Sequence, residues 1–239
     1  MKTEILQILR NTDGYVSGQQ LCDTLGVSRT AVWKVINQLK EEGYEIEAVR
    51  NRGYRIVEAA DVLNASELKS RLHTKHIGSE IYYQSEIDST NSWLKRLAEE
   101  GAPDGSVTIA DMQSRGKGRR GRVWVTPFGT SIPFSILLRP DIRPERASML
   151  TLVMGLCVAE AMEQLYGMDV GIKWPNDVVV NGKKICGILT EMTMQAEYID
   201  SVIIGTGINA NMQEFPEELQ DKIEELEEVS AKNTGLNLQ

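Results

Sequence analysis

The stretch LCDTLGVSRTAVWKVINQLKEEGYEIE, residues 21–47, sets the organisation of the first part of the chain. It predicts the end of one helix, a turn at Gly26 and a second helix over residues 29–42. Ser28 is suited to cap the start of this second helix, and Gly43 is suited to end it. Apolar side chains recur at helical spacing along one side of the second helix, which predicts that this side packs into a core.

The residues on either side of this stretch predict further helices and a hairpin. Residues 2–11 carry isoleucine and leucine at helical spacing, and Ser17 can cap a helix that runs to Gly26. Residues 44–49 and 53–57 are predicted to form two strands joined by a basic turn. Two short helices with a tight glycine turn and a following hairpin are typical of a winged helix-turn-helix, and the stretch resembles winged-helix repressors.

This resemblance implies that the first domain, expected over residues 1–60, binds operator DNA. In such a domain the second helix meets base edges, and basic residues at the tip of the wing meet phosphates. The residues expected to contact DNA are Ser28, Arg29, Thr30, Trp33, Lys34, Asn37, Arg50 and Arg52. Residues 1–60 hold eight basic and eight acidic residues, so we expect modest affinity per copy and binding as a dimer. The alternative is a three-helix module that only packs against the rest of the chain.

The composition of the whole chain is that of a folded protein with room for two domains. It has 239 residues, of which 41% are hydrophobic and 25% charged, with a formal net charge of -8. Cys22, Cys157 and Cys186 are too scattered for a disulfide framework or a metal site, so we expect them only to pack. No apolar signal segment opens the chain, and the longest apolar run, about residues 147–159, is shorter than the ~20 residues of a membrane span. We therefore expect a cytoplasmic protein with no membrane association and no resident metal.

A boundary between two domains is expected at about residues 60–64, with residues 61–80 as a linker that includes a short helix. From residue 81 onward, strands and helices alternate. Strands are predicted over residues 81–84, 106–110, 131–138, 171–174, 177–180, 184–192 and 200–208, and helices over residues 90–99 and 144–166. This order predicts an α+β domain whose mixed sheet is covered by helices on one face. Residues 214–228 are predicted to form an acidic helix that supplies much of the net charge.

The main chemical feature of the second domain is the loop QSRGKGRRGR, residues 113–122, with five basic residues and no acidic one. Gly116, Gly118 and Gly121 have the spacing GxGxxG, but a dinucleotide site needs a helix directly after them, and residues 122–129 predict a strand and a turn. A protein-kinase loop is excluded because the chain has no HRD or DFG element. A solvated nucleic-acid patch is the simplest alternative for a basic run. The interleaved glycines favour instead a loop that closes over an anionic, reactive ligand, as nucleotidyl transfer requires.

Three further segments carry polar groups. Residues 88–91 (DSTN) open a helix with hydroxyl and amide groups at its positive end. Residues 173–177 (KWPND) make a polar turn between two strands, and residues 182–187 (GKKICG) place a lysine at the start of an apolar strand. Each segment alone is an ordinary cap, turn or strand end. Together with the basic loop, they predict one polar and cationic site.

These segments, taken in order, are similar to those of a known family. The chain closely resembles biotin–protein ligases in five motifs: DSTN (88–91), GKGRRGRVW (116–124), KWPND (173–177), GKKICGIL (182–189) and GTGIN (205–209). With the N-terminal domain, the resemblance is to the bifunctional form, a biotin–[acetyl-CoA-carboxylase] ligase and biotin operon repressor. It implies a class II synthetase-like catalytic domain with a mixed sheet over residues 81–239. The family normally continues into a small β-barrel domain, so that C-terminal domain is expected to be absent.

The resemblance implies a reaction in two steps. The biotin carboxylate attacks the α-phosphate of ATP to give biotinyl-5′-AMP and pyrophosphate, and a lysine of a biotin carboxyl carrier protein then takes the biotinyl group. Mg²⁺ is expected with ATP, because displaced pyrophosphate is otherwise a poor leaving group. In repressors of this family the adenylate also favours a homodimer, and the dimer binds operator DNA.

The resemblance also implies roles for individual residues. The expected biotin-binding residues are Ser89, Thr90, Asn91, Gln113, Lys117, Gly118, Arg119 and Lys184. The expected nucleotide-binding residues are Lys117, Arg120, Arg122, Trp124, Asn176 and Asn209. Lys184 and Arg119 are the expected catalytic residues, because a fixed cation stabilises charge on the phosphate and the loop folds over the adenylate. Position 117 is lysine where the family usually has arginine, so the charge is kept and the planar hydrogen-bonding fork is lost.

Two alternatives stand beside the ligase and repressor. The first is a DNA-binding sensor of biotin or biotinyl-AMP, with impaired transfer because the C-terminal domain is missing. The second is a lipoate-type acyl ligase, which shares the fold. The basic glycine loop and the KWPND turn favour biotin over lipoate.

Overall fold

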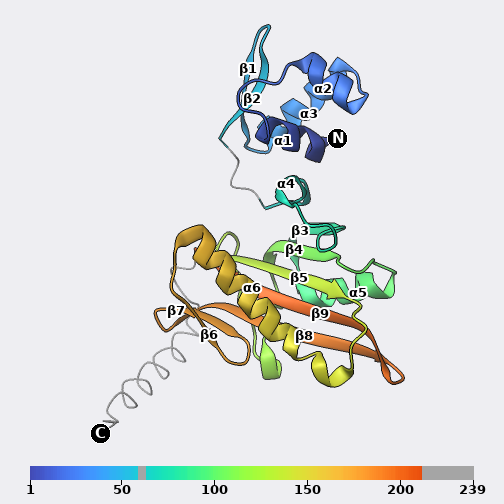
Figure 1. Ribbon diagram of the computed structural model, residues 1–239, viewed down its shortest axis with the longest axis vertical. Helices are drawn as coiled ribbons and strands as arrows, with labels where there is room; N and C mark the ends of the chain where they lie inside the picture. Colours follow the sequence, from blue (N-terminus) through green and yellow to red (C-terminus); the bar gives the residue numbers. More distant parts are fainter. Residues whose placement is uncertain (59–62, 212–239) are drawn as a thin grey trace.

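The computed structural model describes residues 1–58 and 63–211 of the chain. Figure 1 shows a small N-terminal body and a larger body built on a sheet, with helix α4 (Ala65–Arg71) between them. The acidic helix predicted over residues 214–228 lies outside the described residues.

The small body consists of three helices and a hairpin: α1 (Lys2–Arg10), α2 (Gly18–Leu25), α3 (Arg29–Glu41), β1 (Glu45–Val49) and β2 (Gly53–Glu58). Both predicted serine caps form, since Ser17 Oγ accepts from the N–H of Gln20 (3.1 Å) and Ser28 Oγ from the N–H of Ala31 (3.2 Å). Gly26 ends α2 with a φ of 65°, which glycine adopts without strain. The apolar sides of the three helices meet in one core, which includes Ile5, Leu6, Leu9, Leu21, Val32, Val35, Ile36 and Leu39.

A third backbone segment anchors the hairpin of the small body. Val16, just before α2, exchanges two backbone hydrogen bonds of 2.9 Å with Tyr54. Gly53 has a φ of 114°, and a Cβ there would lie 2.0 Å from the carbonyl oxygen of Val16. Only glycine therefore fits at this position, and the contact fixes the wing against the helices.

One buried carboxylate, Glu67, joins α4 to the small body. Arg10 Nη2 donates to both carboxylate oxygens (2.5 and 2.6 Å), the Tyr44 hydroxyl donates to Oε2 (2.5 Å), and Arg71 Nε donates to Oε1 (2.7 Å). Burial alone would raise the pKa of Glu67, but the hydrogen bonds from Arg10, Tyr44 and Arg71 outweigh burial and lower it. Burial and the bond to Glu67 raise the pKa of Tyr44, so its hydroxyl keeps the proton that it donates.

The larger body is built on a seven-stranded sheet. Its strands in spatial order are β3 (Ile81–Ile87), β4 (Val107–Gln113), β5 (Ser131–Leu138), β9 (Tyr198–Asn209), β8 (Lys183–Gln195), β7 (Asp177–Val180) and β6 (Val170–Lys173). Strands β3 and β4 are parallel, and every other neighbouring pair is antiparallel. The predicted mixed sheet is therefore confirmed.

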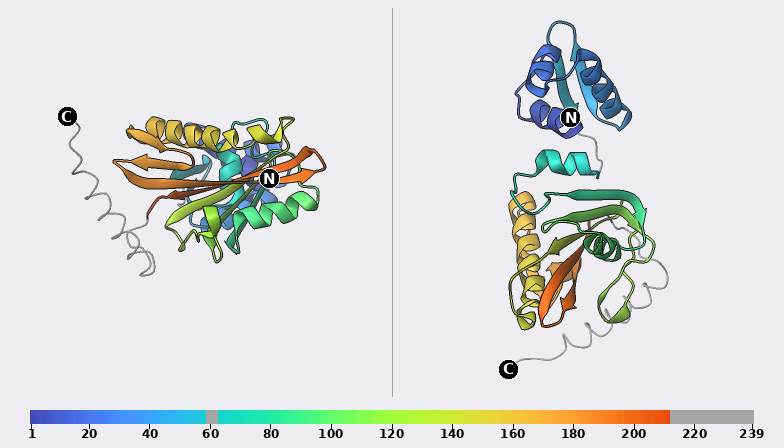
Figure 2. Two further views of the ribbon diagram at one scale, coloured as in Figure 1. Left: turned by 90° about the horizontal axis from the view of Figure 1, so that it is seen from below. Right: turned by 90° about the vertical axis from the view of Figure 1, so that its right-hand side faces the viewer.

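Helices cover both faces of this sheet, so the prediction of a single covered face is wrong. In the left view of Figure 2, α6 (Met149–Tyr166) lies on one side of the sheet and α5 (Thr90–Glu99) on the other. The physical reason lies in β9, whose consecutive apolar residues point to opposite faces. Ile203 packs in the cluster beneath α5, whereas Val202 and Ile204 pack in the cluster beneath α6. Such a strand carries a continuous apolar run instead of an alternating pattern.

Helix α6 begins later than predicted, and the stretch that contains it is strongly apolar. Residues Pro144–Arg146 form a separate 3-10 turn, η2, before α6 starts at Met149. By length and composition alone, the stretch Pro144–Tyr166 could cross a membrane, since a window of 18 residues in it has a mean hydropathy of 1.3. In this structure it packs on the sheet instead, where Val158 and Ala159 are buried. Only one side of the helix packs there, and Met149, Val153, Leu156 and Leu165 on its other sides are exposed.

The cysteines divide into two groups. Cys22 and Cys186 are buried among apolar side chains, as predicted. Burial raises the pKa of the Cys186 thiol to about 12, which keeps it protonated and unreactive. Cys157 is exposed on α6, so the expectation that it packs is wrong.

Candidate active site

A cleft lies where the start of α5, strands β8 and β9 and the loop after β4 meet. Two adjoining pockets form this cleft, and both are lined by Gly118, Arg119, Trp124, Asn176 and Lys184. The first pocket contains all eight residues expected to bind biotin. The second contains five of the six expected to bind the nucleotide: Arg120, Arg122, Trp124, Asn176 and Asn209. Lys117, the sixth, lines the first pocket.

Neutral hydrogen-bonding groups line the first pocket at the start of α5. Gln113 Oε1 accepts from the backbone N–H of Thr90 (2.8 Å) and from its hydroxyl (3.0 Å), while Gln113 Nε2 donates to Thr126 Oγ1 (3.2 Å). Ser89 caps the helix, and Ser89, Thr90 and Asn91 are all buried. This wall is uncharged and directional, which suits a neutral polar group such as a urea.

The side chain of Asn91 is held on both sides of its amide. Its Nδ2 donates to the carbonyl oxygen of Leu189 (3.3 Å) and to Oε2 of Glu191 (2.7 Å). Its Oδ1 accepts from the hydroxyl of Ser135 (2.6 Å), a buried residue of β5 whose Oγ also lies 2.9 Å from Thr90 Oγ1. No local sequence pattern indicates Leu189, Glu191 and Ser135 as partners of Asn91, because they belong to strands far away along the chain.

An ion pair fixes the turn before α5. Asp88 accepts two hydrogen bonds of 2.9 Å from the guanidinium of Arg96 and one of 2.8 Å from the N–H of Ser89. The Arg96 guanidinium holds the pKa of Asp88 below its usual range. The pair is partly exposed and contributes little to stability, but it holds the DSTN turn in one geometry.

Glycines on β8 and β9 make room for the side chains that fill the cleft. A Cβ on Gly207 would lie 2.5 Å from Trp124 Nε1, and a Cβ on Gly187 would lie 2.8 Å from Cζ3 of the same ring. A Cβ on Gly205 would lie 2.0 Å from Asn91 Oδ1. Of the GTGIN motif, only Asn209 was among the predicted site residues. Two glycines at alternate strand positions are a signal for close approach that could have identified this floor.

Trp124 carries an unpaired donor in the cleft. Its Nε1 is buried and has no hydrogen-bond partner among residues 1–58 and 63–211. A buried donor without a partner is costly unless a ligand or water satisfies it. This indole therefore suits a ligand with an acceptor atom at that point.

The basic loop is folded back on itself. The N–H of Gly118 donates to the carbonyl oxygen of Arg122 (2.7 Å), and the N–H of Trp124 donates to that of Gly116 (2.9 Å). Between them lies a 3-10 turn, η1 (Arg119–Gly121), in which Arg120 has a left-handed φ of 57°.

The strand predicted after the glycines does not form. Val123 makes only an isolated bridge with Lys117, and Thr126 another with Gln113. The backbone of residues 122–126 pairs with its own loop and the end of β4 instead of with a further strand of the sheet. The prediction of a strand over residues 122–125 is therefore wrong.

Arg119 closes the loop against the KWPND turn. Its Nη1 donates to Asn176 Oδ1 (2.8 Å). Asn176 Nδ2 in turn donates to Asp177 Oδ1 (2.9 Å) and to the carbonyl oxygen of Ile188 (3.3 Å). The loop and the turn, two of the motifs quoted above, thus form one wall between the pockets.

Lys184 lies between the two pockets. Its Nζ is 2.8 Å from Asp177 Oδ1 and 5.2 Å from the centroid of the Trp124 ring. In the β7–β8 pairing Lys184 lies opposite Val179, and strand residues two apart share a face, so Lys184 and Asp177 point to the same side. Asp177 was not among the predicted site residues, although the tight hairpin between β7 and β8 is a signal that it lies close to Lys184.

The second pocket is strongly cationic. Three arginines and Lys184 line it, which suits a polyanionic ligand such as a nucleoside triphosphate. In the described ranges, 1–58 and 63–211, no group of three or more His, Cys, Asp or Glu side chains could hold a metal ion.

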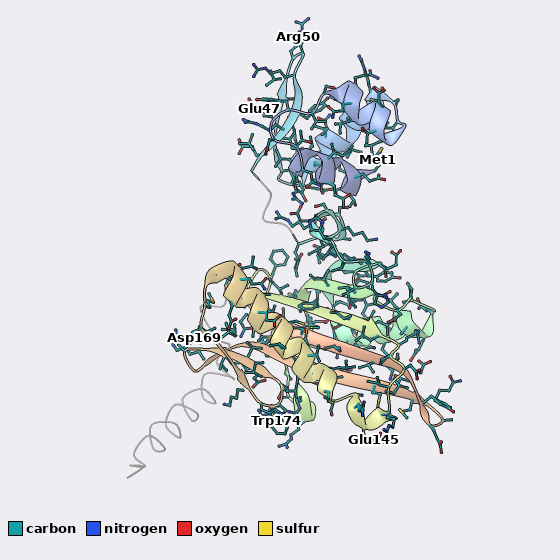
Figure 3. All side chains as sticks on the ribbon, viewed as in Figure 1. Met1, Glu47, Arg50, Glu145, Asp169 and Trp174 are labelled. Carbon is teal, nitrogen blue, oxygen red and sulfur yellow. The ribbon has the colours of Figure 1, made fainter. Side chains whose placement is uncertain are left out.

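The residues expected to contact DNA lie on the small body, on helix α3 and on the wing. Ser28, Arg29, Thr30, Trp33 and Lys34 are exposed at the start of α3, and Asn37 is half-buried. Arg50 and Arg52 are exposed on the wing, and Figure 3 shows Arg50 at its tip. Arg29 also donates to Gln19 of α2 (2.7 and 3.2 Å), so it braces the turn between the two helices.

Residues 83–209 match the biotin/lipoate A/B protein ligase family, and residues 2–55 match an HTH domain. The chain therefore belongs to the biotin/lipoate A/B protein ligase family, with a helix-turn-helix domain ahead of the ligase domain. The predicted fold, a winged helix-turn-helix followed by a mixed-sheet ligase domain, is confirmed.

The relatives that match most of the chain combine two functions in one protein. The "Bifunctional ligase/repressor BirA" of Bacillus spizizenii is 45% identical over 218 residues, which cover 90% of this chain and 67% of that protein. The protein of the same name from Bacillus subtilis is 44% identical, over 87% of this chain and 64% of its own length. The one from Escherichia coli is 34% identical, over 98% of this chain and 70% of its own. The chain thus spans about two thirds of the length of these relatives.

A solved structure supports the same family. The biotin protein ligase from Aquifex aeolicus, in complex with biotin and ATP, matches with a TM-score of 0.51 and 39% sequence identity. The match covers 60% of this chain and 57% of that chain.

Proposed function

We propose that this chain is a biotin–protein ligase and a biotin-responsive transcriptional repressor. In the first step a carboxylate oxygen of biotin forms a bond to the α-phosphorus of ATP. The bond from that phosphorus to the bridging oxygen breaks, and pyrophosphate leaves. In the second step the amine of a lysine on the biotin carboxyl carrier of acetyl-CoA carboxylase attacks the biotinyl carbonyl and loses a proton, and AMP leaves.

The observation that carries this proposal is the position of Lys184 between two chemically different pockets. The first pocket has a neutral wall made by Thr90, Asn91 and Gln113, which suits the uncharged ureido ring of biotin. The second pocket is cationic and suits ATP. A carboxylate in the first pocket and an α-phosphate in the second would meet at Lys184.

Lys184 and Arg119 act at that junction. Lys184 stabilises the negative charge that develops on the α-phosphate, and its position is fixed before the reaction by Asp177. Arg119, with Arg120 and Arg122, neutralises phosphate charge. The loop that carries them keeps water away from the mixed anhydride.

Mg²⁺ enters with ATP as part of the substrate. Asn176 and Asn209 line the second pocket, and the side chain of each carries an oxygen, the ligand atom that Mg²⁺ prefers. The ion supplies charge neutralisation for the departing pyrophosphate.

The repressor half of the proposal rests on the exposed side of α3 and the basic wing. We propose that biotinyl-AMP in the cleft favours a homodimer and that the dimer places two wings and two α3 helices on operator DNA. The protein works in the cytoplasm, where its carrier, ATP and operator are found.

Mass spectrometry of a carrier domain tests the ligase assignment. The purified chain, ATP, Mg²⁺, biotin and the carrier domain are incubated together, and we expect the carrier mass to rise by one biotinyl group. Tight biotin binding without any transfer would assign the chain as a DNA-binding biotin sensor. Transfer of lipoate in preference to biotin would assign it as a lipoate-type ligase.

A further inference from the structure

Glu191 on β8 has no role in the proposed reaction so far, yet it contacts both sides of the first pocket. Its Oε2 accepts from Asn91 Nδ2 (2.7 Å), and its Oε1 lies 4.0 Å from Lys117 Nζ. Asn91 belongs to the wall at the start of α5, and Lys117 belongs to the basic loop. A single carboxylate therefore links the fixed wall of the pocket to the loop that covers it.

The contact with Glu191 controls the orientation of the Asn91 amide. An asparagine side chain has two orientations that exchange its donor and its acceptor. A carboxylate only accepts, so Glu191 requires Nδ2 to face β8, which leaves Oδ1 facing the hydroxyl of Ser135 (2.6 Å). The other acceptor for Nδ2, the carbonyl of Leu189, is uncharged and farther away, at 3.3 Å. The bond to Glu191 is thus the shorter of the two, and the charge of its acceptor makes it the stronger.

The orientation of this amide shapes the pocket. Asn91 is 4% exposed, and a Cβ on Gly205 would lie 2.0 Å from its Oδ1, so the amide is packed directly against the floor strand. Its partner Ser135 lies 2.9 Å from Thr90 Oγ1, and Thr90 in turn is bonded to Gln113. If the Asn91 amide exchanged its donor and acceptor, the whole row of hydrogen bonds from Asn91 to Gln113 would be disturbed.

We propose that Glu191 is a positioning residue for the biotin side of the reaction. It acts through Asn91, whose amide it orients, and secondarily through Lys117, whose charge it balances. This inference rests on the proposed function. Glu191 itself lines neither pocket, but its two partners, Asn91 and Lys117, line the first and not the second, so its influence is on biotin and does not extend to ATP.

Calorimetry and steady-state kinetics on the full chain test the inference. In Glu191→Ala we expect the Kd and KM for biotin to rise about tenfold, while the KM for ATP and the kcat for pyrophosphate release stay within about twofold. Glu191→Gln keeps an oxygen that accepts from Asn91, so its Kd for biotin should return to within about threefold of wild type. The exposed carboxylate of Glu86 on β3 offers a matched control, and Glu86→Ala should bind biotin as wild type does.

A double-mutant cycle shows whether Glu191 acts through Asn91. If it does, Glu191→Ala adds little to the loss already caused by Asn91→Ala, so the combined effect is clearly less than the product of the two. Each of three outcomes would overturn the inference and leave the proposed function standing. The first is a biotin affinity of Glu191→Ala within twofold of wild type, and the second is an equal loss of biotin affinity in the Ala and Gln variants. The third is a fully multiplicative loss of biotin affinity in the double-mutant cycle. A wild-type chain that binds no biotin would overturn the proposed function, and the inference with it.

Discussion

The ion pair with Asp177 fixes the position of the Lys184 ammonium before any ligand binds. The ammonium is held 2.8 Å from the carboxylate and near the face of Trp124. A preorganised cation needs no rearrangement when charge develops in a transition state, and that is the main source of electrostatic catalysis.

Replacement of this cation should therefore slow the first step. In Lys184→Ala we expect biotin adenylation to fall at least ~100-fold, because a contact made in the transition state is lost. Pyrophosphate release at saturating biotin and ATP measures it. Lys183→Ala, at an exposed neighbouring position outside both pockets, is the control. A near-normal rate in Lys184→Ala would remove this lysine from the mechanism.

A methyl group on the floor of the cleft should displace Trp124. In Gly207→Ala the new Cβ would lie 2.5 Å from Trp124 Nε1, so the indole has to move and the second pocket changes shape. We expect at least ~10-fold weaker ATP binding by calorimetry. Gly155→Ala on α6 is the matched control, because its Cβ would meet nothing closer than 3.7 Å. Wild-type ATP affinity in Gly207→Ala would show that Trp124 is not held by this floor.

Local residue patterns predicted some contacts and could not predict others. The caps at Ser17 and Ser28 and the turn at Gly26 depend on neighbours three or four positions away, and all three form as expected. Asn91, by contrast, bonds to Ser135 and Glu191, which are 44 and 100 positions distant. Such contacts depend on the order of strands in the sheet, which no local pattern carries.

The basic loop is the element that separates the cleft from solvent. Its shortest side-chain contact to the opposite wall runs from Arg119 to Asn176 on the KWPND turn (2.8 Å), and Lys117 lies farther from Glu191 on β8, at 4.0 Å. The glycines predicted a loop able to change shape, and the structure adds the point at which it is fastened.

Loss of this contact should let the activated intermediate escape. In Arg119→Gly we expect biotin to appear on lysines of a bystander protein such as serum albumin, because the open loop no longer retains the adenylate. A blot for protein-bound biotin measures the labelling, with Arg115→Ala, an exposed loop residue outside both pockets, as the control. If Arg119→Gly labels only its carrier, another group must retain the intermediate.

Helix α3 and the wing should contribute separately to DNA binding. Lys34→Ala and Arg52→Ala are each expected to weaken operator binding. Each should also make the negative slope of log affinity against log salt less steep by about one, because each removes one phosphate neutralisation. Gel shifts over a salt series measure both effects. Lys40→Ala, at the far end of α3, controls for the loss of any positive charge. An unchanged slope in both variants would reject this surface.

Elements were predicted well where one periodicity dominated. The helices of the small body and most strands of the sheet lie where the sequence places them. The prediction failed at residues 122–125, where a strand was expected but the backbone pairs within its own loop. The prediction that helices cover only one face of the sheet also failed. The apolar run around Val202–Ile204 does not show which helix packs on which side.

The two bodies of the molecule are connected through α4. Glu67 binds this helix to Arg10 and Tyr44 of the small body, and Lys69 of the same helix lies 3.4 Å from Glu80 next to β3. The buried cluster is stronger than the exposed pair. We therefore expect α4 to move together with the small body and any hinge to lie between α4 and β3.

This cluster should make stability depend on pH. The pKa of Glu67 is lowered from its usual 4.5, so its contribution is fully present above about pH 4.5 and is lost as the pH falls through the lowered value. In Glu67→Gln we expect the free energy of unfolding to fall by about 3 kcal/mol near neutral pH and to decline less steeply in acid.

Urea unfolding at several pH values measures this change. Glu45→Gln, an exposed carboxylate on β1, is the control and should follow wild type. A Glu67→Gln profile parallel to wild type in acid would show that Glu67 is not the group that titrates.

Strand β9 packs against both helical layers, and its last residues form the floor of the cleft. In saturation mutagenesis of the whole chain, we expect β9 to tolerate the fewest substitutions, because a change in this strand disturbs the core and the substrate site together. Changes in substrate choice are then expected at the borders of the cleft. These borders are the basic loop and the β6–β7 turn, which pack against neither of the two helical layers. A directed-evolution library confined to those two segments would keep most of its members folded.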